Sequence, residues 1–153
     1  MKTLFAAVLP LITAVLGYLL SAKYRESSDF WDRFSFWHKK IKASVSFSQD
    51  PLPEIFNGEN DNDAFFRIAK EYIENKTLSD KLSFLSKAEK DFLIKYLQAL
   101  GTTDKNSQLN FLNSMENELE TFRLSAETKN KRYRPLFVKL GFLAGLIVFI
   151  LII

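Results

Sequence analysis

The sequence contains no cysteine and only one histidine, His38. Without cysteine the chain can form neither a disulfide nor a thiolate metal site, and it has no thiol nucleophile. His38 has no metal-binding partner four positions away on a helix, so we expect a partly exposed surface residue and predict no bound metal. Stability must therefore come from packing and from the surroundings of the chain.

Glycine is also scarce, with five residues in the chain. Nucleotide-binding loops need clustered glycines so that the backbone can approach phosphate closely, and these five form no such pattern. An acid/base pair needs two carboxylates whose pKa values differ. Glu116, Glu118 and Glu120 lie on one predicted helix with no buried neighbour to separate their pKa values, so we expect a solvated face there. We therefore predict a protein that is not an enzyme, with no catalytic residues and no cofactor.

Charge is almost missing from both ends of the chain. All acidic residues, and all basic residues except Lys2 and Lys139, lie between Lys23 and Arg134. The formal net charge of +3 comes from basic clusters beside the uncharged ends rather than from a broad patch, so we expect no nucleic-acid binding. The charged middle has the length of one soluble domain.

The amino-terminal uncharged run extends from Leu4 to Ala22. At ~1.5 Å per residue, a helix of this length just crosses a ~30 Å hydrocarbon core. A cleaved signal peptide is the alternative, but its apolar region is usually ~7–15 residues long and Leu20-Ser21-Ala22 is a poor cleavage site. We therefore predict a transmembrane helix over residues 1–22.

A second apolar segment covers residues 136–153, and its one charge, Lys139, lies near the start, where the side chain can reach the headgroups. Gly141 and Gly145 form a G-x-x-x-G pattern, which lets another helix approach closely because no side chain separates the backbones. We predict a helix-packing role for both glycines, with the first segment or a partner subunit as neighbour. The alternative is that glycine is simply common in membrane helices.

Basic residues flank both apolar segments on the side of the charged middle. By the positive-inside rule, residues 23–135 then form a cytoplasmic domain and both termini face outward. The flanking residues are Lys23, Arg25, Arg33, Lys39, Lys40, Lys42, Lys129, Lys131, Arg132 and Arg134.

The middle of the chain has the periodicity of helices, because large apolar residues recur three and four positions apart. Ser86 and Glu89 match a capping box, and Gly101 ends the helix that follows. No alternating run is long enough for a sheet, so we predict an all-α fold: a small helical bundle domain flanked by an N-terminal and a C-terminal transmembrane helix. The residues expected to face inward are Phe30, Phe34, Trp37, Ile41, Val45, Phe65, Ile68, Ala69, Tyr72, Ile73, Leu93, Tyr96, Leu97, Leu100, Phe111, Met115, Leu119, Phe122 and Ala126.

Three motifs resemble those of one protein family and occur in the same order. FSQDPLPEIF resembles an aromatic-x-x-T-P-L-P-E-A-F motif, with Asp50 in place of its threonine; LGTTDKNSQ resembles L-G-x-x-D-x-x-x-Q; and LGFLAGL matches a membrane motif. In a two-span protein of this length, they resemble the stage III sporulation protein AB family of endospore-forming bacteria over essentially the whole chain. The first two motifs contain Pro51, Leu52, Pro53, Glu54, Phe56, Gly101, Asp104 and Gln108.

The resemblance implies a platform or docking subunit of the channel that joins mother cell and forespore, because the family is similar to the inner-membrane platform protein of type II secretion and type IV pilus machines. The implied partners are a cytoplasmic secretion-type ATPase, other membrane proteins of the channel and the lipid bilayer. The implied location is the mother-cell membrane around the forespore, crossed twice. Most platform proteins repeat the helical domain, so a homodimer, a higher oligomer or a partner would supply a second copy.

The eight residues of the first two motifs are our candidates for partner binding. The alternative for them is helix termination, with proline ending one helix and Gly101 capping another. A different hypothesis for the whole chain is a membrane-tethered regulatory protein that dimerises through its C-terminal helix.

Overall fold

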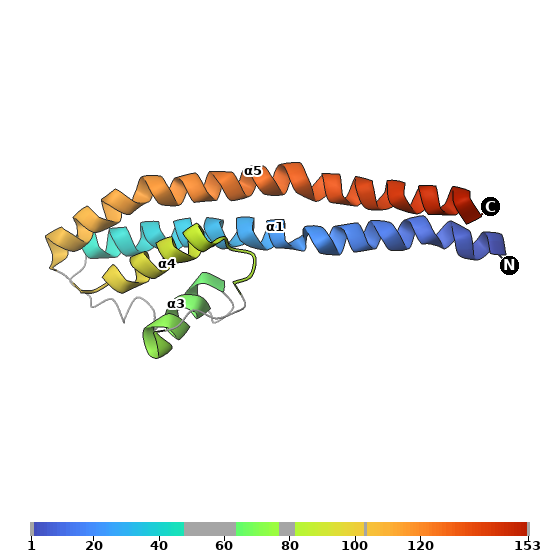
Figure 1. Cartoon of the computed structure of the whole chain (residues 1–153). Helices are drawn as coiled ribbons and strands as arrows, with labels where there is room; N and C mark the ends of the chain where they lie inside the picture. The colour runs from blue at the N-terminus through green and yellow to red at the C-terminus, as the bar shows by residue number, and fades with distance from the viewer. Residues whose placement is uncertain (1, 48–63, 77–81, 103, 153) are drawn as a thin grey trace. The chain divides into compact units, whose positions relative to one another are not determined.

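The structure is a computed structural model that describes residues 2–47, 64–76, 82–102 and 104–152. These residues form four α-helices, α1 (Lys2–Phe47), α3 (Ala64–Asn75), α4 (Lys87–Ala99) and α5 (Lys105–Ile152) (Figure 1). No strand occurs among them. The all-α fold predicted from the periodicity is therefore confirmed.

The chain divides into two compact units. The terminal unit comprises Met1–Ser28 and Ala126–Ile153, and the central unit comprises Asp29–Ser125. Both α1 and α5 contribute residues to each unit, whereas α3 and α4 belong to the central unit alone. The polypeptide therefore connects the two units twice, once in each long helix. The domain limits predicted at residues 22 and 135 fall inside these two helices.

Aromatic side chains fill the core of the central unit. The ring of Phe34 in α1 stacks on Phe65 of α3 with 4.4 Å between ring centroids, and it meets Tyr96 of α4 edge-on at 4.8 Å. One turn earlier, Trp31 stacks on Phe122 of α5 at 5.0 Å. A single face of α1 thus contacts the other three helices, and each such aromatic pair adds about 0.5–1.5 kcal/mol beyond the area that it buries.

Most of the residues expected to face inward are buried. They are Phe30, Phe34, Trp37, Ile41, Phe65, Ile68, Ala69, Tyr72, Leu93, Tyr96, Leu97, Met115, Leu119 and Ala126. Val45, Leu100, Phe111 and Phe122 are only half-buried. The rings of Phe111 and Phe122 nevertheless face the core, where they contact Tyr96 and Trp31, respectively. The side chain of Ile73 lies outside the described residues.

Within the helices of the central unit, four large apolar residues are buried that the predicted stripes missed: Trp31, Phe66, Phe92 and Leu112. Each of them is a direct sequence neighbour of a residue that the periodicity did select. The predicted residues cover one face of each helix, which is the pattern of a helix packed on one side only. In the central unit several helices pack around one aromatic cluster, so the buried face of each is wider.

A capping box opens α4, as predicted. The backbone N–H of Glu89 donates to Oγ of Ser86 at 3.4 Å, and the carboxylate of Glu89 accepts from the backbone N–H of Ser86 at 2.7 Å. Both bonds satisfy donors that a helix start leaves without intrahelical partners, and such a cap stabilises a helix by about 1 kcal/mol.

Candidate functional site

Three of the predicted contact residues, Gly101, Asp104 and Gln108, come together in the connection between α4 and α5. Gly101 follows the C-cap of α4 with a φ of 75°, in the left-handed region that favours glycine. Asp104 precedes α5, and its carboxylate accepts a hydrogen bond from the backbone N–H of Ser107 at 3.2 Å. Hydrogen bonding from Ser107 lowers the pKa of the Asp104 carboxyl, so this cap stays ionised.

Gln108 joins the two ends of this connection. Its side-chain oxygen accepts a hydrogen bond from the backbone N–H of Gly101 at 3.1 Å. Gln108 is 3% exposed, whereas Gly101 and Asp104 are exposed. The motif therefore has the spacing of a connection between two helices. Its glycine makes the turn, its aspartate caps the second helix, and its glutamine bonds back to the glycine. Of these three residues, Gly101 and Asp104 present surface that a partner could contact.

The other candidates for partner binding, Pro51, Leu52, Pro53, Glu54 and Phe56, lie outside the described residues. Their helix-ending and partner-binding interpretations stay predictions.

His38 is buried, and the prediction of a partly exposed surface residue was wrong. The residue is 1% exposed, and a hydrogen bond of 3.0 Å joins its Nδ1 to the hydroxyl of Tyr96. His38 follows Phe34 by four positions on α1 and so shares its inward face. Burial is the main cause that lowers the pKa of His38; the charges of Lys42 and Lys39 lower it further, and Glu116 acts in the opposite direction.

Burial also raises the pKa of the Tyr96 hydroxyl. Both members of the pair are therefore neutral at pH 7, and the bond is one between uncharged groups. The Nε2 atom of His38 has no hydrogen-bond partner in the part of the chain that the structure describes. This arrangement disfavours protonation of His38, because the protonated ring carries a hydrogen on both nitrogens and the N–H at Nε2 would remain without an acceptor.

The charged side chains of the central unit pair across its long helices. Lys42 of α1 donates to the carboxylate of Glu116 in α5 at 2.6 Å. Arg123 of α5 contacts Asp32 at 3.2 Å and Glu120 at 2.6 Å. Hydrogen bonds from Lys42 and Arg123 lower the pKa values of Glu116 and Glu120, respectively. The two carboxylates are thus shifted in the same direction and both stay ionised.

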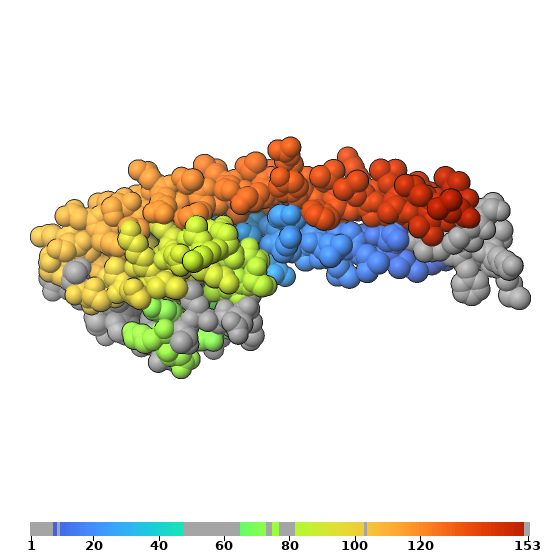
Figure 2. Space-filling model, viewed as in Figure 1, coloured from blue at the N-terminus to red at the C-terminus, as the bar shows by residue number. Residues whose placement is uncertain are grey.

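In the terminal unit, α1 and α5 approach each other closely through their backbones at glycine positions. Gly141 of α5 lies against the backbone of Thr13, where an added Cβ would also be 3.3 Å from Cα of Gly17. An added Cβ at Gly145 would meet the backbone of Pro10 and the hydroxyl of Thr13. The partners on α1 move toward the amino terminus as those on α5 move toward the carboxyl end, so the two segments are antiparallel. They lie side by side along their length in Figures 1 and 2.

A third glycine completes this seam. An added Cβ at Gly17 would meet the backbone oxygen of Phe137 and lie 3.4 Å from Cα of Val138. Helix pairs with small residues at such points bring their backbones unusually close, as in membrane proteins. Of the two neighbours expected for Gly141 and Gly145, the structure places the first segment of the same chain against them.

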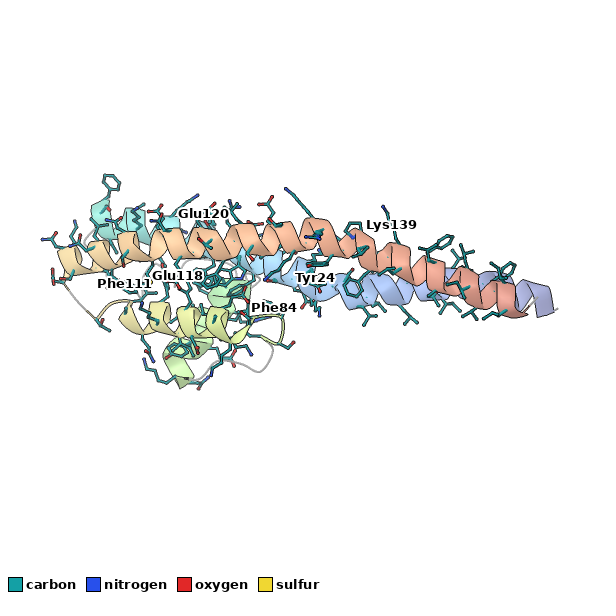
Figure 3. The ribbon with its side chains drawn as sticks, turned by 45° about the horizontal axis from the view of Figure 1, so that its top comes forward. Tyr24, Phe84, Phe111, Glu118, Glu120 and Lys139 are labelled. Carbon is teal, nitrogen blue, oxygen red and sulfur yellow. The ribbon has the colours of Figure 1, made fainter. Side chains whose placement is uncertain are left out.

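Large apolar side chains cover the outside of the terminal unit. Among the described residues, one helix, Lys105–Leu151, is long and apolar enough to cross a membrane, and 6% of its apolar window is buried. The predicted span at residues 136–153 falls mostly in this helix, with Lys139 pointing away from the neighbouring segment (Figure 3). The exposed residues are Val8, Leu11, Ile12, Val15, Leu16, Leu19, Leu20, Leu136, Leu140, Phe142, Leu143, Ile147, Val148, Ile150 and Leu151. The span over residues 1–22 stays a prediction.

A family model described as stage III sporulation protein AB matches residues 2–153. The chain belongs to the stage III sporulation protein AB family. The resemblance drawn from the three motifs is therefore confirmed. Comparisons with curated proteins and with solved structures return no match.

Membership of the stage III sporulation protein AB family and the apolar helix α5 together indicate a membrane protein with a part in sporulation. The LGTTDKNSQ motif, which carried part of the resemblance, has a structural explanation in this family member. Gly101, Asp104 and Gln108 hold one another in place at the start of α5. The buried His38, by contrast, had no signal in the sequence beyond its spacing from Phe34.

Proposed function

We propose that this member of the stage III sporulation protein AB family is a platform subunit of the channel between mother cell and forespore. In this role it couples a cytoplasmic secretion-type ATPase to the membrane complex. The terminal unit lies in the mother-cell membrane around the forespore as two spans, and the central unit faces the cytoplasm. Two neighbouring features support the membrane part: the apolar exterior of the terminal unit and the basic residues beside it, which follow the apolar run in α1 and precede it in α5.

The observation that carries this proposal is the double connection between the units. The central unit is attached to the membrane unit through α1 at Ser28 and through α5 at Ser125. A domain attached by one connection can rotate freely about it, whereas two covalent connections restrict that rotation. Such an attachment suits a subunit that transmits position or force between an ATPase and membrane partners.

The exposed part of the α4 to α5 connection is the candidate contact for the ATPase. Gly101 and Asp104 are exposed there, and the backbone N–H of Gly101 is hydrogen-bonded to the side chain of Gln108. A backbone group that such a bond already holds loses little conformational freedom when a partner binds.

Photocrosslinking in sporulating cells tests this contact. A photoreactive amino acid replaces Asp104 in the full chain, and Lys87, which is exposed at the other end of α4, serves as the matched control position. We expect crosslinks to the ATPase from position 104 and far fewer from position 87. Equal crosslinking from both positions, or no crosslink to any channel component, would count against the contact.

A topology test addresses the membrane part separately. Reporters placed at the C-terminus and after Gly58 should report the outside and the cytoplasm, respectively, in the full chain. A reporter after Gly58 that is active only outside the cytoplasm would remove the access to a cytoplasmic ATPase.

The alternative, a membrane-tethered regulator that dimerises through its C-terminal helix, needs a free glycine ridge. Gly141 and Gly145 already contact Pro10 and Thr13 of the same chain, so a second copy would have to displace α1. Deleting the gene separates the two hypotheses: the platform predicts a block in spore development after engulfment, and the regulator predicts effects in vegetative cells.

A further inference from the structure

Aromatic and basic side chains gather at one level of the terminal unit. The ring of Tyr24 in α1, labelled in Figure 3, stacks on Tyr133 of α5 with 5.3 Å between centroids and lies 5.8 Å from the ring of Phe137. Nη2 of Arg134 donates to the hydroxyl of Tyr18 at 3.3 Å. These contacts bring two segments that are more than a hundred positions apart in the sequence to the same level. We name the group the aromatic-basic belt, and it consists of Tyr18, Lys23, Tyr24, Arg132, Tyr133 and Arg134.

The cations of the belt lie against tyrosine rings. Nζ of Lys23 is 5.1 Å from the ring centre of Tyr24, Cζ of Arg132 is 5.7 Å from that of Tyr133, and Cζ of Arg134 is 5.3 Å from that of Tyr18. A ring face attracts and orients a cation but does not cancel its charge, as a carboxylate would. The positive charge of the belt therefore remains for another anion.

The terminal unit offers few anions of its own. Its two stretches contain eight basic residues and two acidic ones, Glu26 and Glu127. Glu127 is paired with Lys131 at 2.5 Å, on the neighbouring turn of α5. The central unit is the opposite case, with sixteen acidic and thirteen basic residues. Its cations Lys42 and Arg123 are bound to carboxylates.

The belt borders the apolar exterior of the terminal unit. Tyr18 is 45% exposed and is followed by the exposed Leu19 and Leu20 on α1, while exposed Leu136 follows Arg134 by two positions on α5. An aromatic ring beside a cation, next to an apolar surface, matches the boundary between acyl chains and headgroups. Arg side chains suit phosphate in particular, because the guanidinium group can donate two parallel hydrogen bonds.

We propose that the aromatic-basic belt is a binding site for the phosphate headgroups of anionic phospholipids. The site would make this chain prefer anionic over zwitterionic lipid as its immediate neighbour. This inference rests on the membrane placement in the proposed function, and it is independent of any contact with an ATPase.

Spin-labelled lipids measure such a preference directly. The full chain is reconstituted into phosphatidylcholine vesicles with a trace of spin-labelled phosphatidylglycerol or spin-labelled phosphatidylcholine, and electron spin resonance gives the fraction of each held beside the protein. We expect a preference for phosphatidylglycerol on the order of fivefold, the attraction of about one basic residue to an anionic surface. The preference should fall toward one at high salt, because exposed charges are screened.

Three double variants test whether the belt is responsible. Arg132→Gln with Arg134→Gln should lose most of the preference, whereas Arg132→Lys with Arg134→Lys keeps both charges and should retain most of it. Lys87→Gln with Lys95→Gln removes two exposed charges of the central unit and should leave the preference unchanged.

Equal association of the two lipids with the unaltered chain would overturn the lipid site alone. Absence of restricted lipid of either kind would overturn the membrane placement as well, so the two failures are distinguishable. Loss of the preference on adding inorganic phosphate at matched ionic strength would also overturn the proposal, because it would assign the belt to a soluble anion.

Discussion

The two units of this chain solve the packing of helices in opposite ways. The central unit buries its largest side chains, such as Trp31 and Phe34, and keeps most of its charges outside, with Glu89 of the capping box as an exception. The terminal unit joins its helices through Gly17, Gly141 and Gly145 and leaves its large apolar side chains outside. In water, burial of apolar area drives helices together, whereas in lipid that driving force is absent and close backbone packing replaces it. The difference agrees with the proposed placement of the terminal unit in lipid and of the central unit in water.

The largest effect should follow from removing an aromatic ring from the central unit. We expect Phe34→Ala to lower the free energy of unfolding by about 3–5 kcal/mol, because the ring is fully buried against Phe65 and Tyr96. Urea unfolding of the full chain in detergent, followed by tryptophan fluorescence, measures the change.

Phe47, on the same helix, is the matched control because it is 92% exposed. Phe47→Ala should change the stability by less than about 0.5 kcal/mol. Similar losses for both variants would mean that the central unit does not depend on its aromatic core.

In the terminal unit, adding a side chain, rather than removing one, should be the damaging change. Gly145→Leu adds a side chain where even a Cβ meets the backbone of Pro10, and such overpacking costs about 1–3 kcal/mol. Ala144→Leu adds the same bulk at an exposed position in the same motif. We expect only the first to separate the two helices.

Crosslinking measures that separation in a chain without natural cysteines. Cysteines introduced at Tyr24 and Tyr133, whose rings stack, should react with a short bismaleimide in the parent and in the Ala144→Leu variant. The yield should fall several-fold with Gly145→Leu. An unchanged yield would show that the glycine seam does not hold the helices together.

Gly101 of the central unit differs from the glycines of the terminal unit, because it permits a positive φ rather than close helix packing. Its φ of 75° is unfavourable for a side chain, so Gly101→Val should cost about 1–2 kcal/mol in urea unfolding. Asn tolerates this region of backbone space, and Gly101→Asn should cost less than half as much. Equal losses would point to contacts of the position rather than to its backbone conformation.

The smallest effect concerns pH and arises from His38. Its pKa is lowered in the folded chain, so between that pKa and the ordinary value of 6.5 the unfolded chain binds more protons. Stability is therefore fully present above pH 6.5 and decreases as the pH falls below it, until the folded pKa is reached. His38→Gln should remove this slope just below pH 6.5, whereas Glu116 and Glu120 affect stability only at lower pH, since the ordinary pKa of glutamate is about 4.3. A slope that persists in the variant would assign it to another group.

The helices of the central unit and most of its core could be predicted from the sequence, because apolar spacing and capping are local properties. Trp31 and Phe92 were missed because their burial depends on a second neighbouring helix, which no local pattern encodes. His38 was misjudged for a related reason: the spacing from Phe34 places it inward, and only the distant Tyr96 provides its polar partner. The helix connection at Gly101 was predicted as a cap, but its tie to Gln108 needed the geometry of both helices.

The packing of the terminal unit was harder to predict, because a G-x-x-x-G pattern does not determine which helix packs against it. The sequence does not say whether Gly141 and Gly145 meet another chain or the first segment of their own. Pro10, Thr13 and Gly17 provide the complementary surface, and their spacing of three and four places them on one face of α1. No local pattern pairs that face with Gly141 and Gly145. The aromatic-basic belt was missed for the same reason, since its tyrosines come from both ends of the sequence.

Assembly of the terminal unit from Met1–Ser28 and Ala126–Ile153 has a consequence for biosynthesis. The ribosome completes all of Asp29–Ser125 before it makes the helix that covers Pro10, Thr13 and Gly17. During that interval the central unit can begin to fold while the first segment remains without its partner. Its small-residue groove is then exposed to other helices, so nascent chains of this protein pass through a stage in which mispairing competes with the correct hairpin.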